Sequence, residues 1–249
     1  MKRALLLAVA VALLLAACGG DDGTSATETT TTSALTADGR VYWLLDGKVW
    51  PAARELETPG VASAALEELF AGPSEQEQAD LEFETALPDD VEPSEVTIEE
   101  GVAAVEPDTE LTAAAKAQIV YTLTQFPTVQ SVEIDGTSYT RADFEDQTPP
   151  VLVESPLPFE EVESPLRVTG TANTFEATFN YELTDTDGRI VDENFVTATS
   201  GTGTRGTFDF TTDEYEIPFD GVGSLIVFER SAEDGSRIHI VEIPLRMSR

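Results

Sequence analysis

Cys18 has the most informative chemistry in this sequence, because it is the only cysteine and it directly follows an apolar segment. Lys2 and Arg3 precede the 14 apolar residues Ala4–Ala17. A basic start, an apolar centre and small residues at the end are typical of an export signal. At about 1.5 Å per residue the apolar run would cover about 21 Å, less than the bilayer core of about 30 Å. We therefore predict a signal peptide over residues 1–17, cut between Ala17 and Cys18.

The stretch Leu15-Ala16-Ala17-Cys18 resembles the lipobox of bacterial lipoproteins. The resemblance implies that the Cys18 thiol is acylated and that the lipid holds the mature chain on the outer face of the cytoplasmic membrane. The alternative is an ordinary signal peptide with an incidental cysteine. We favour lipidation because the lone cysteine stands where the pattern needs it. An acylated thiol excludes Cys/His zinc sites and Cys-His catalysis.

Other groups that could do chemistry have simpler structural interpretations. His239 is the only histidine and lies in a predicted strand, where a hydrogen-bonded structural role is favoured over that of a catalytic base. Asp89-Asp90 lacks the spaced acidic loop of a calcium site, and Asp185-Thr186-Asp187-Gly188 is typical of a turn. We predict no catalytic residue, no metal site and no cofactor, and we expect no enzyme. Composition leaves open a hydrolase that uses two of the 47 acidic residues.

The charge balance is strongly acidic, with 14 Lys and Arg against 47 Asp and Glu. Removing Lys2 and Arg3 with the signal leaves 12 basic residues and a formal charge of −35. Such a field repels phosphate backbones and anionic lipid surfaces, so nucleic acid is not an expected partner. A solvated acidic surface, as in proteins adapted to saline media, is favoured over a specific cationic ligand.

Composition shifts divide the chain into four parts. After the signal peptide, residues 18–39 are rich in Gly, Asp, Ser and Thr and predict a flexible tether. Residues 40–146 and 149–249 predict two folded domains, separated by the polar, proline-rich stretch Gln147-Thr148-Pro149-Pro150.

The first domain is predicted to follow the order β-α-β-β-α-β, an α+β layer. Strands are expected at 41–45, in a hairpin over 96–105 and at 129–134, and Val49-Trp50 begins a returning strand that Pro51 stops. Thr58-Pro59 predicts a helix start, with Ala62, Ala65, Leu66 and Leu69 on one buried face. Ser74 to Glu77 fits a capping box for a further short turn of helix. A second helix is capped by Thr112, carries a stripe that reaches Phe126 and stops at Pro127.

The second domain is predicted to be an antiparallel β-sandwich of immunoglobulin type. Asp187-Gly188 and Asp234-Gly235 are expected hairpin turns, because glycine tolerates positive φ. Seven short strand-like runs recur in about 97 residues with turn signals between them: 151–154, 166–172, 175–184, 189–199, 206–211, 224–230 and 237–245.

Both regions also resemble known families. Ser164-Pro165 through Ala172, Gly206-Thr207-Phe208 and Val227-Phe228-Glu229 are similar to the immunoglobulin-like domain that accompanies GerMN domains in bacterial spore-germination proteins. The run Ala65-Leu66 to Gly72-Pro73 and the stretch 118–124 resemble the GerMN domain itself. The resemblance implies envelope localisation and a binding or scaffold role, and it carries no catalytic motif.

The expected function is therefore a non-catalytic, lipid-anchored envelope protein that acts as a protein–protein assembly or sensing module. A peptidoglycan or wall-glycan binder is the first alternative, and a carboxylate-dependent wall hydrolase the second. Aromatic residues offer one place for glycan binding. Tyr42 and Trp43 are adjacent in a strand, so alternation assigns one of them to the core and leaves the side of the other open. Core packing is the default for both residues and for Trp50.

Overall fold

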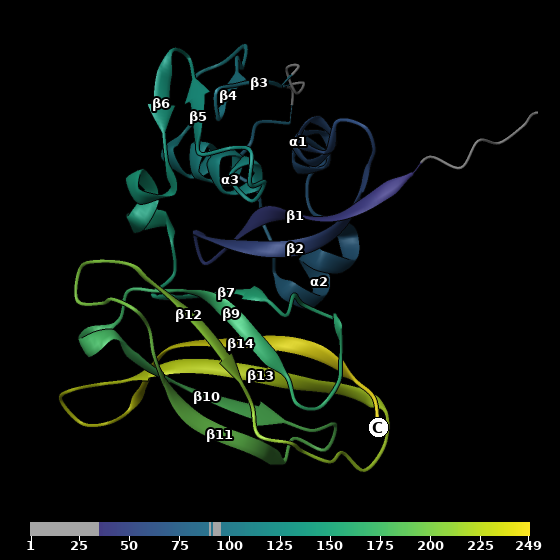
Figure 1. The fold of residues 1–249 in the computed structure, drawn as a ribbon, viewed down its shortest axis with the longest axis vertical. Helices are drawn as coiled ribbons and strands as arrows, with labels where there is room; N and C mark the ends of the chain where they lie inside the picture. The colour runs from purple at the N-terminus through teal and green to yellow at the C-terminus, as the bar shows by residue number, and fades with distance from the viewer. Residues whose placement is uncertain (1–34, 90, 92–95) are drawn as a thin grey trace, which may run out of the picture. The chain divides into compact units, whose positions relative to one another are not determined.

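The computed structural model describes residues 35–89, 91 and 96–249 (Figure 1). The predictions for Ala17, Cys18 and most of the tether lie outside the described residues. Ala34–Arg249 forms one compact unit that contains both folded regions. Among the described residues, no helix has the length and apolar character needed to cross a membrane.

The first folded region begins with the antiparallel hairpin of β1 (Thr36–Leu45) and β2 (Lys48–Glu57), in which Trp43 pairs with Trp50. The prediction that Pro51 stops the returning strand is wrong, since β2 continues past Pro51 to Glu57. This hairpin is a two-stranded sheet, so the outer edge of β2 has no neighbouring strand. A proline can occupy such an edge because its missing N–H costs no ladder hydrogen bond there.

Helix α1 (Val61–Ala71) buries Ala62, Ala65, Leu66 and Leu69, which confirms the predicted face. The predicted cap at Thr58 is wrong. The Thr58 hydroxyl donates to the Leu35 carbonyl, and Gly60 (φ 100°) takes the N-cap position without a side-chain bond. The short helix α2 (Glu75–Leu81) has the predicted capping box between Ser74 and Glu77.

A second sheet completes the first region, in the order β3 (Thr97–Glu99), β4 (Val102–Val105), β5 (Ser131–Ile134) and β6 (Thr137–Tyr139). Strands β4 and β5 are parallel and are joined through α3 (Ala113–Leu123), whose first turn is capped by Thr112 as predicted. The helix ends before Phe126, which therefore lies outside the predicted stripe. The α+β class is confirmed, with β2 and β6 as strands additional to the predicted order. A 3-10 segment, η1 (Arg141–Gln147), leads out of the region.

The second folded region is the predicted β-sandwich. One sheet has the order β11-β10-β13-β14-β8 and the other the order β12-β9-β7. All seven predicted strands are confirmed, and the very short β8 is additional. A 3-10 turn, η2 (Phe175–Ala177), precedes β10. The strands are β7 (Val151–Ser155), β8 (Glu161–Val162), β9 (Arg167–Ala172), β10 (Thr178–Thr184), β11 (Ile190–Thr197), β12 (Gly206–Thr211), β13 (Gly221–Arg230) and β14 (Arg237–Met247).

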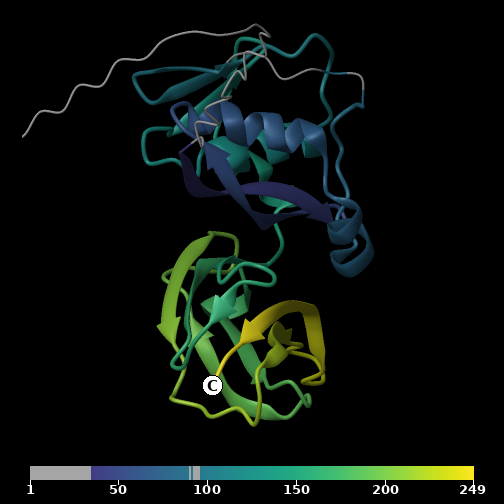
Figure 2. The same cartoon turned by 90° about the vertical axis from the view of Figure 1, so that its right-hand side faces the viewer.

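The core of the first region lies where α1 and α3 pack against the β1–β2 hairpin (Figure 2). Tyr42 and Trp43 are both fully buried and Trp50 is 5% exposed. Core packing, the default expected for all three residues, is therefore confirmed. The hairpin is covered on both faces, so successive side chains of β1 are buried although they point in opposite directions. Leu152 of β7 also belongs to this core, although its strand lies in the second region.

Gly170 in β9 is required by a close backbone approach. A Cβ at this position would lie 2.1 Å from the Leu152 carbonyl oxygen and 2.6 Å from a Phe208 ring carbon. We expect Gly170→Ala to destabilise the protein by about 3 kcal/mol or more, since overpacking against backbone has little room to relax. Chemical unfolding would measure this, with Thr169→Ala on the same strand as the control. A loss below about 0.5 kcal/mol would contradict the close approach.

Candidate functional site

His239 is a hydrogen-bonded strand residue. It sits at a bulge in β14 with φ 52°, opposite an irregular stretch of β13. Its Nδ1 lies 2.7 Å from Oε1 of Glu229, a nearly buried side chain whose other oxygen accepts from the Phe175 N–H. Nearby backbone and side-chain groups thus hold both members of the pair in place.

The acidic stretch at Asp185 is a turn, as predicted. Its carboxylate accepts from the N–H groups of Asp187 and Arg189, at 3.0 and 2.9 Å, and pairs with the Arg189 guanidinium. Although desolvation opposes it, these hydrogen bonds lower the pKa of Asp185. Among the described residues, no group of three or more His, Cys, Asp or Glu side chains is placed to hold a metal ion. Asp90 of the other acidic pair lies outside the described residues.

A polar cluster joins the two folded regions. Glu154 of β7 accepts from Arg141 at 2.7 Å and from the Tyr42 hydroxyl at 2.5 Å. The Arg141 guanidinium also lies 4.6 Å from the Tyr121 ring centroid, and its Nε donates to the Thr124 hydroxyl. Because these contacts span β1, η1 and β7, the cluster fixes one region against the other.

Burial and pairing shape the ionisation of this cluster. Desolvation raises the pKa of the Tyr42 hydroxyl, which stays protonated and donates to Glu154. Burial alone would raise the pKa of Glu154, but Arg141 and the Tyr42 hydrogen bond together lower it. The carboxylate is therefore held in its charged form by positive and hydrogen-bonding neighbours.

The lowered pKa of Glu154 predicts an acid dependence of stability. Its stabilising contribution is fully present above the unfolded-state pKa of about 4.3 and is lost as pH falls through the folded-state value. We expect the unfolding free energies of wild type and Glu154→Gln to differ at pH 7 and to approach each other as the pH falls below the unfolded-state pKa of Glu154. Urea titrations at several pH values would check this. A difference that stays constant down to pH 3 would contradict the assignment.

A second ion pair links the regions. Glu145 of η1 forms two hydrogen bonds with Arg205, at 2.9 and 3.0 Å, and accepts from the Asn173 amide at 2.8 Å. Arg205 also donates to the Pro149 carbonyl at 2.8 Å. Arg205 of the second region thus contacts both η1 and the segment that connects the two regions. These contacts fix the connecting segment against the second region.

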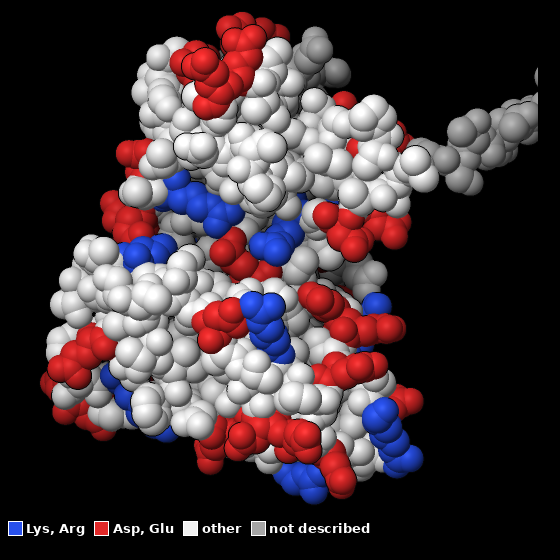
Figure 3. Space-filling view, in the orientation of Figure 1, with Lys and Arg blue, Asp and Glu red and all other residues white. Residues whose placement is uncertain are grey.

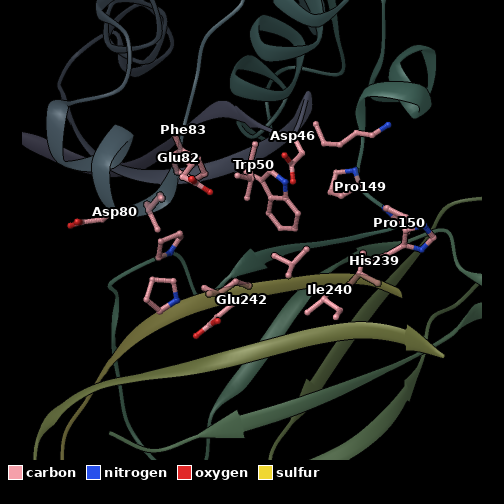
Figure 4. A pocket seen from close by; sticks show the side chains of 18 residues that line it. Asp46, Trp50, Asp80, Glu82, Phe83, Pro149, Pro150, His239, Ile240 and Glu242 are labelled. Atoms are coloured by element: carbon pink, nitrogen blue, oxygen red, sulfur yellow. The ribbon is translucent and has the colours of Figure 1, made fainter. Parts of the chain in front are cut away.

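A cleft of about 630 Å³ with a mainly apolar lining lies between β2 and β14. Figure 4 shows Trp50 pointing into this cavity from β2, with Ile240 and Glu242 on the opposite wall from β14. Arg54 of β2 makes two hydrogen bonds to Glu77, and these hold α2 near the hairpin. Backbone bonds between Leu44 and Glu84 then place Phe83 at the cleft.

The cleft combines an apolar floor with acidic groups at its rim. Trp50, Phe83, Pro149 and Pro150 contribute apolar walls. The exposed carboxylates on the same lining are Asp46, Asp80, Glu82 and Glu242, against one ammonium, that of Lys48. On the face shown in Figure 3, acidic side chains are likewise spread widely among the uncharged surface. This combination suits binding of an apolar, cationic group.

Comparison with known families agrees with the fold. Residues 40–139 match the family model described as sporulation and spore germination, and residues 150–236 match the immunoglobulin-like domain of bacterial spore germination. The chain carries a GerMN-type germination domain followed by an immunoglobulin-like germination domain. The first matched span ends before η1 and the second begins at Pro150, so the polar cluster and the cleft lie where the two domains meet.

The solved structures that resemble part of the chain include two that illustrate the range. One is the tandem GerMN domains of the sporulation protein GerM from Bacillus subtilis, with 22% identity, a TM-score of 0.34, and coverage of 45% of this chain and 43% of that one. The other is a Clostridium perfringens protein provisionally classed as a lipoprotein, with 15% identity, a TM-score of 0.30, and coverage of 45% and 93%. No curated protein matches the sequence.

The sequence patterns do not predict the polar cluster or the cleft. Tyr42 and Glu154 are 112 positions apart, and Arg141 and Glu154 are separated by the domain boundary. The one sequence signal for the cluster is a charged residue, Glu154, that lies in the apolar strand directly after Pro149-Pro150. An acid in such a strand needs a partner if the strand is buried.

Proposed function

We propose that this chain is a non-catalytic, lipid-anchored cell-envelope protein that acts as an assembly or sensing module for other envelope proteins. The observation that carries the proposal is the pair of germination-type domains in series within one compact unit. The two domains contact each other and leave a cleft that is lined by residues of both. A cleft of this kind offers a place for a segment of a partner protein.

The anchor defines where the module works. A lipid on Cys18 holds the chain at the outer face of the cytoplasmic membrane, and the tether between Cys18 and the start of β1 at Thr36 separates it from the folded domains. At up to about 3.5 Å per residue such a tether reaches several tens of Å. The partner therefore lies near that membrane face or in the wall just above it.

The alternatives are a peptidoglycan or wall-glycan binder and a wall hydrolase. Burial of Tyr42 and Trp43 removes two of the three aromatic residues first considered for a glycan platform, and Trp50, which is 5% exposed, reaches only the wall of the cleft. A hydrolase needs two carboxylates about 5–10 Å apart around a sugar cleft. Glu154 and Glu145 are occupied by arginine pairs that join the domains, so a hydrolase would have to use the exposed carboxylates at the rim of the cleft.

Incubation of the purified full chain with peptidoglycan tests the proposal. The assembly module predicts no soluble muropeptides and no retention on the polymer in moderate salt. Release of muropeptides that is abolished by one carboxylate-to-amide change would establish the hydrolase. Retention that competes with free glycan would establish the binder, and either result would overturn the proposed function.

A further inference from the structure

We infer that the cleft between β2 and β14 docks an extended, basic peptide segment of an envelope partner, which adds to the open edge of β14. This inference rests on the proposed assembly function and names the chemistry of its partner. Strand addition supplies affinity through main-chain hydrogen bonds and selectivity through alternate side chains.

The edge of β14 that borders the cleft is available for pairing. On one side β14 pairs with β13 along its length, whereas on the other β8 pairs only with Arg246 and Met247. Within the described residues, no backbone hydrogen bond beyond the pairing with β13 involves residues 239–243. The open stretch is bounded by the bulge at His239 and by Pro244, whose carbonyl accepts from Phe159.

The length of this edge suits a short segment. Residues 239–244 all line the cleft, as consecutive residues do when a strand presents its edge rather than one face. At about 3.3 Å per residue, five residues present an edge of about 17 Å. An unpaired strand edge is normally protected from pairing by a covering loop, by charges or by proline. In β14 the loop that carries Phe159 covers the edge only from Pro244 onward.

The side-chain environment selects the occupant. Ile240 is 56% exposed and lies across the cavity from Trp50, so alternate apolar side chains of an added strand would be covered there (Figure 4). The rim carboxylates Asp46, Asp80, Glu82 and Glu242 favour lysine or arginine at the positions between. A second mature copy of this chain would bring its own formal charge of −35, which opposes self-docking.

Binding of model peptides to the detergent-solubilised full chain tests this inference. The probe is a heptapeptide of alternating lysine and valine, compared with its glutamate–valine counterpart and with a lysine–valine peptide N-methylated at alternate residues. We expect saturable binding of the first peptide alone by calorimetry, weakening as salt rises. Hydrogen exchange should show new protection at residues 239–243.

Matched variants locate the binding. Ile240→Lys places a cation in the cleft and should weaken binding about tenfold or more. Ile98→Lys, an exposed isoleucine of β3, should leave the affinity unchanged. Equal binding of the N-methylated peptide, or protection only outside 239–243, would overturn strand addition. Absence of peptide binding would reject the assignment of a basic peptide to the cleft, and so would dimerisation without peptide that protects residues 239–243. Neither result bears on the assembly function, which the peptidoglycan incubation tests separately.

Discussion

Cys18→Ser is expected to abolish incorporation of a palmitate analogue into the protein. A serine hydroxyl does not replace the thiol in the lipobox pattern, so both acylation and the cut after Ala17 should fail. The precursor should then keep its first 17 residues and accumulate as a longer chain. Each buried methylene of an acyl chain contributes about 0.8 kcal/mol to membrane binding, so loss of acylation removes the largest anchoring contribution.

Metabolic labelling followed by electrophoresis measures this effect. Ser25→Ala, a change within the predicted tether, is the matched control and should be labelled and cut like wild type. Labelled Cys18→Ser, or a mature chain of normal length without label, would favour the ordinary signal peptide with an incidental cysteine.

Leu152→Ala is expected to destabilise the GerMN domain by about 2–5 kcal/mol, although Leu152 belongs to the neighbouring domain. Its side chain is fully buried and forms part of the GerMN-domain core, so the change removes apolar contacts and leaves a cavity there. Trp43 and Trp50 both lie in this core, so tryptophan fluorescence during urea unfolding reports on it selectively.

Val153→Ala is the control for this prediction. Val153 is the next residue on β7 and packs in the other core, so truncation there should shift the fluorescence midpoint less than Leu152→Ala does. An unchanged midpoint in Leu152→Ala would mean that the two domains are energetically independent, and the cleft between them would then have no fixed walls.

The regular parts of the fold could be predicted from sequence because local patterns determine them. Alternation in β10 and the turn glycines Gly188 and Gly235 specify a sheet without knowledge of its neighbours. The apolar stripe of α1 likewise specified its buried face. Beyond Pro51 the prediction failed, because proline stops most strands but is tolerated in a two-stranded ribbon.

The candidate site could not be predicted because its parts come from distant segments. The cleft combines residues 45–50, 80–83, 149–151 and 239–244, and no periodicity relates these stretches. The bulge at His239 interrupts the alternation of inward and outward side chains along β14, so the sequence does not show which way the His239 side chain points. Glu154 resembles any other acid in a chain with 47 acidic residues until Arg141 and Tyr42 are placed beside it.

The central claim is that the anchored chain works by binding another envelope protein. Cross-linking the full-length protein in intact cells before lysis, followed by affinity purification and mass spectrometry, tests it most directly. The account predicts recovery of a specific envelope protein with wild type and its loss with Cys18→Ser. Recovery of no envelope protein above background from wild-type cells would contradict an assembly or sensing role.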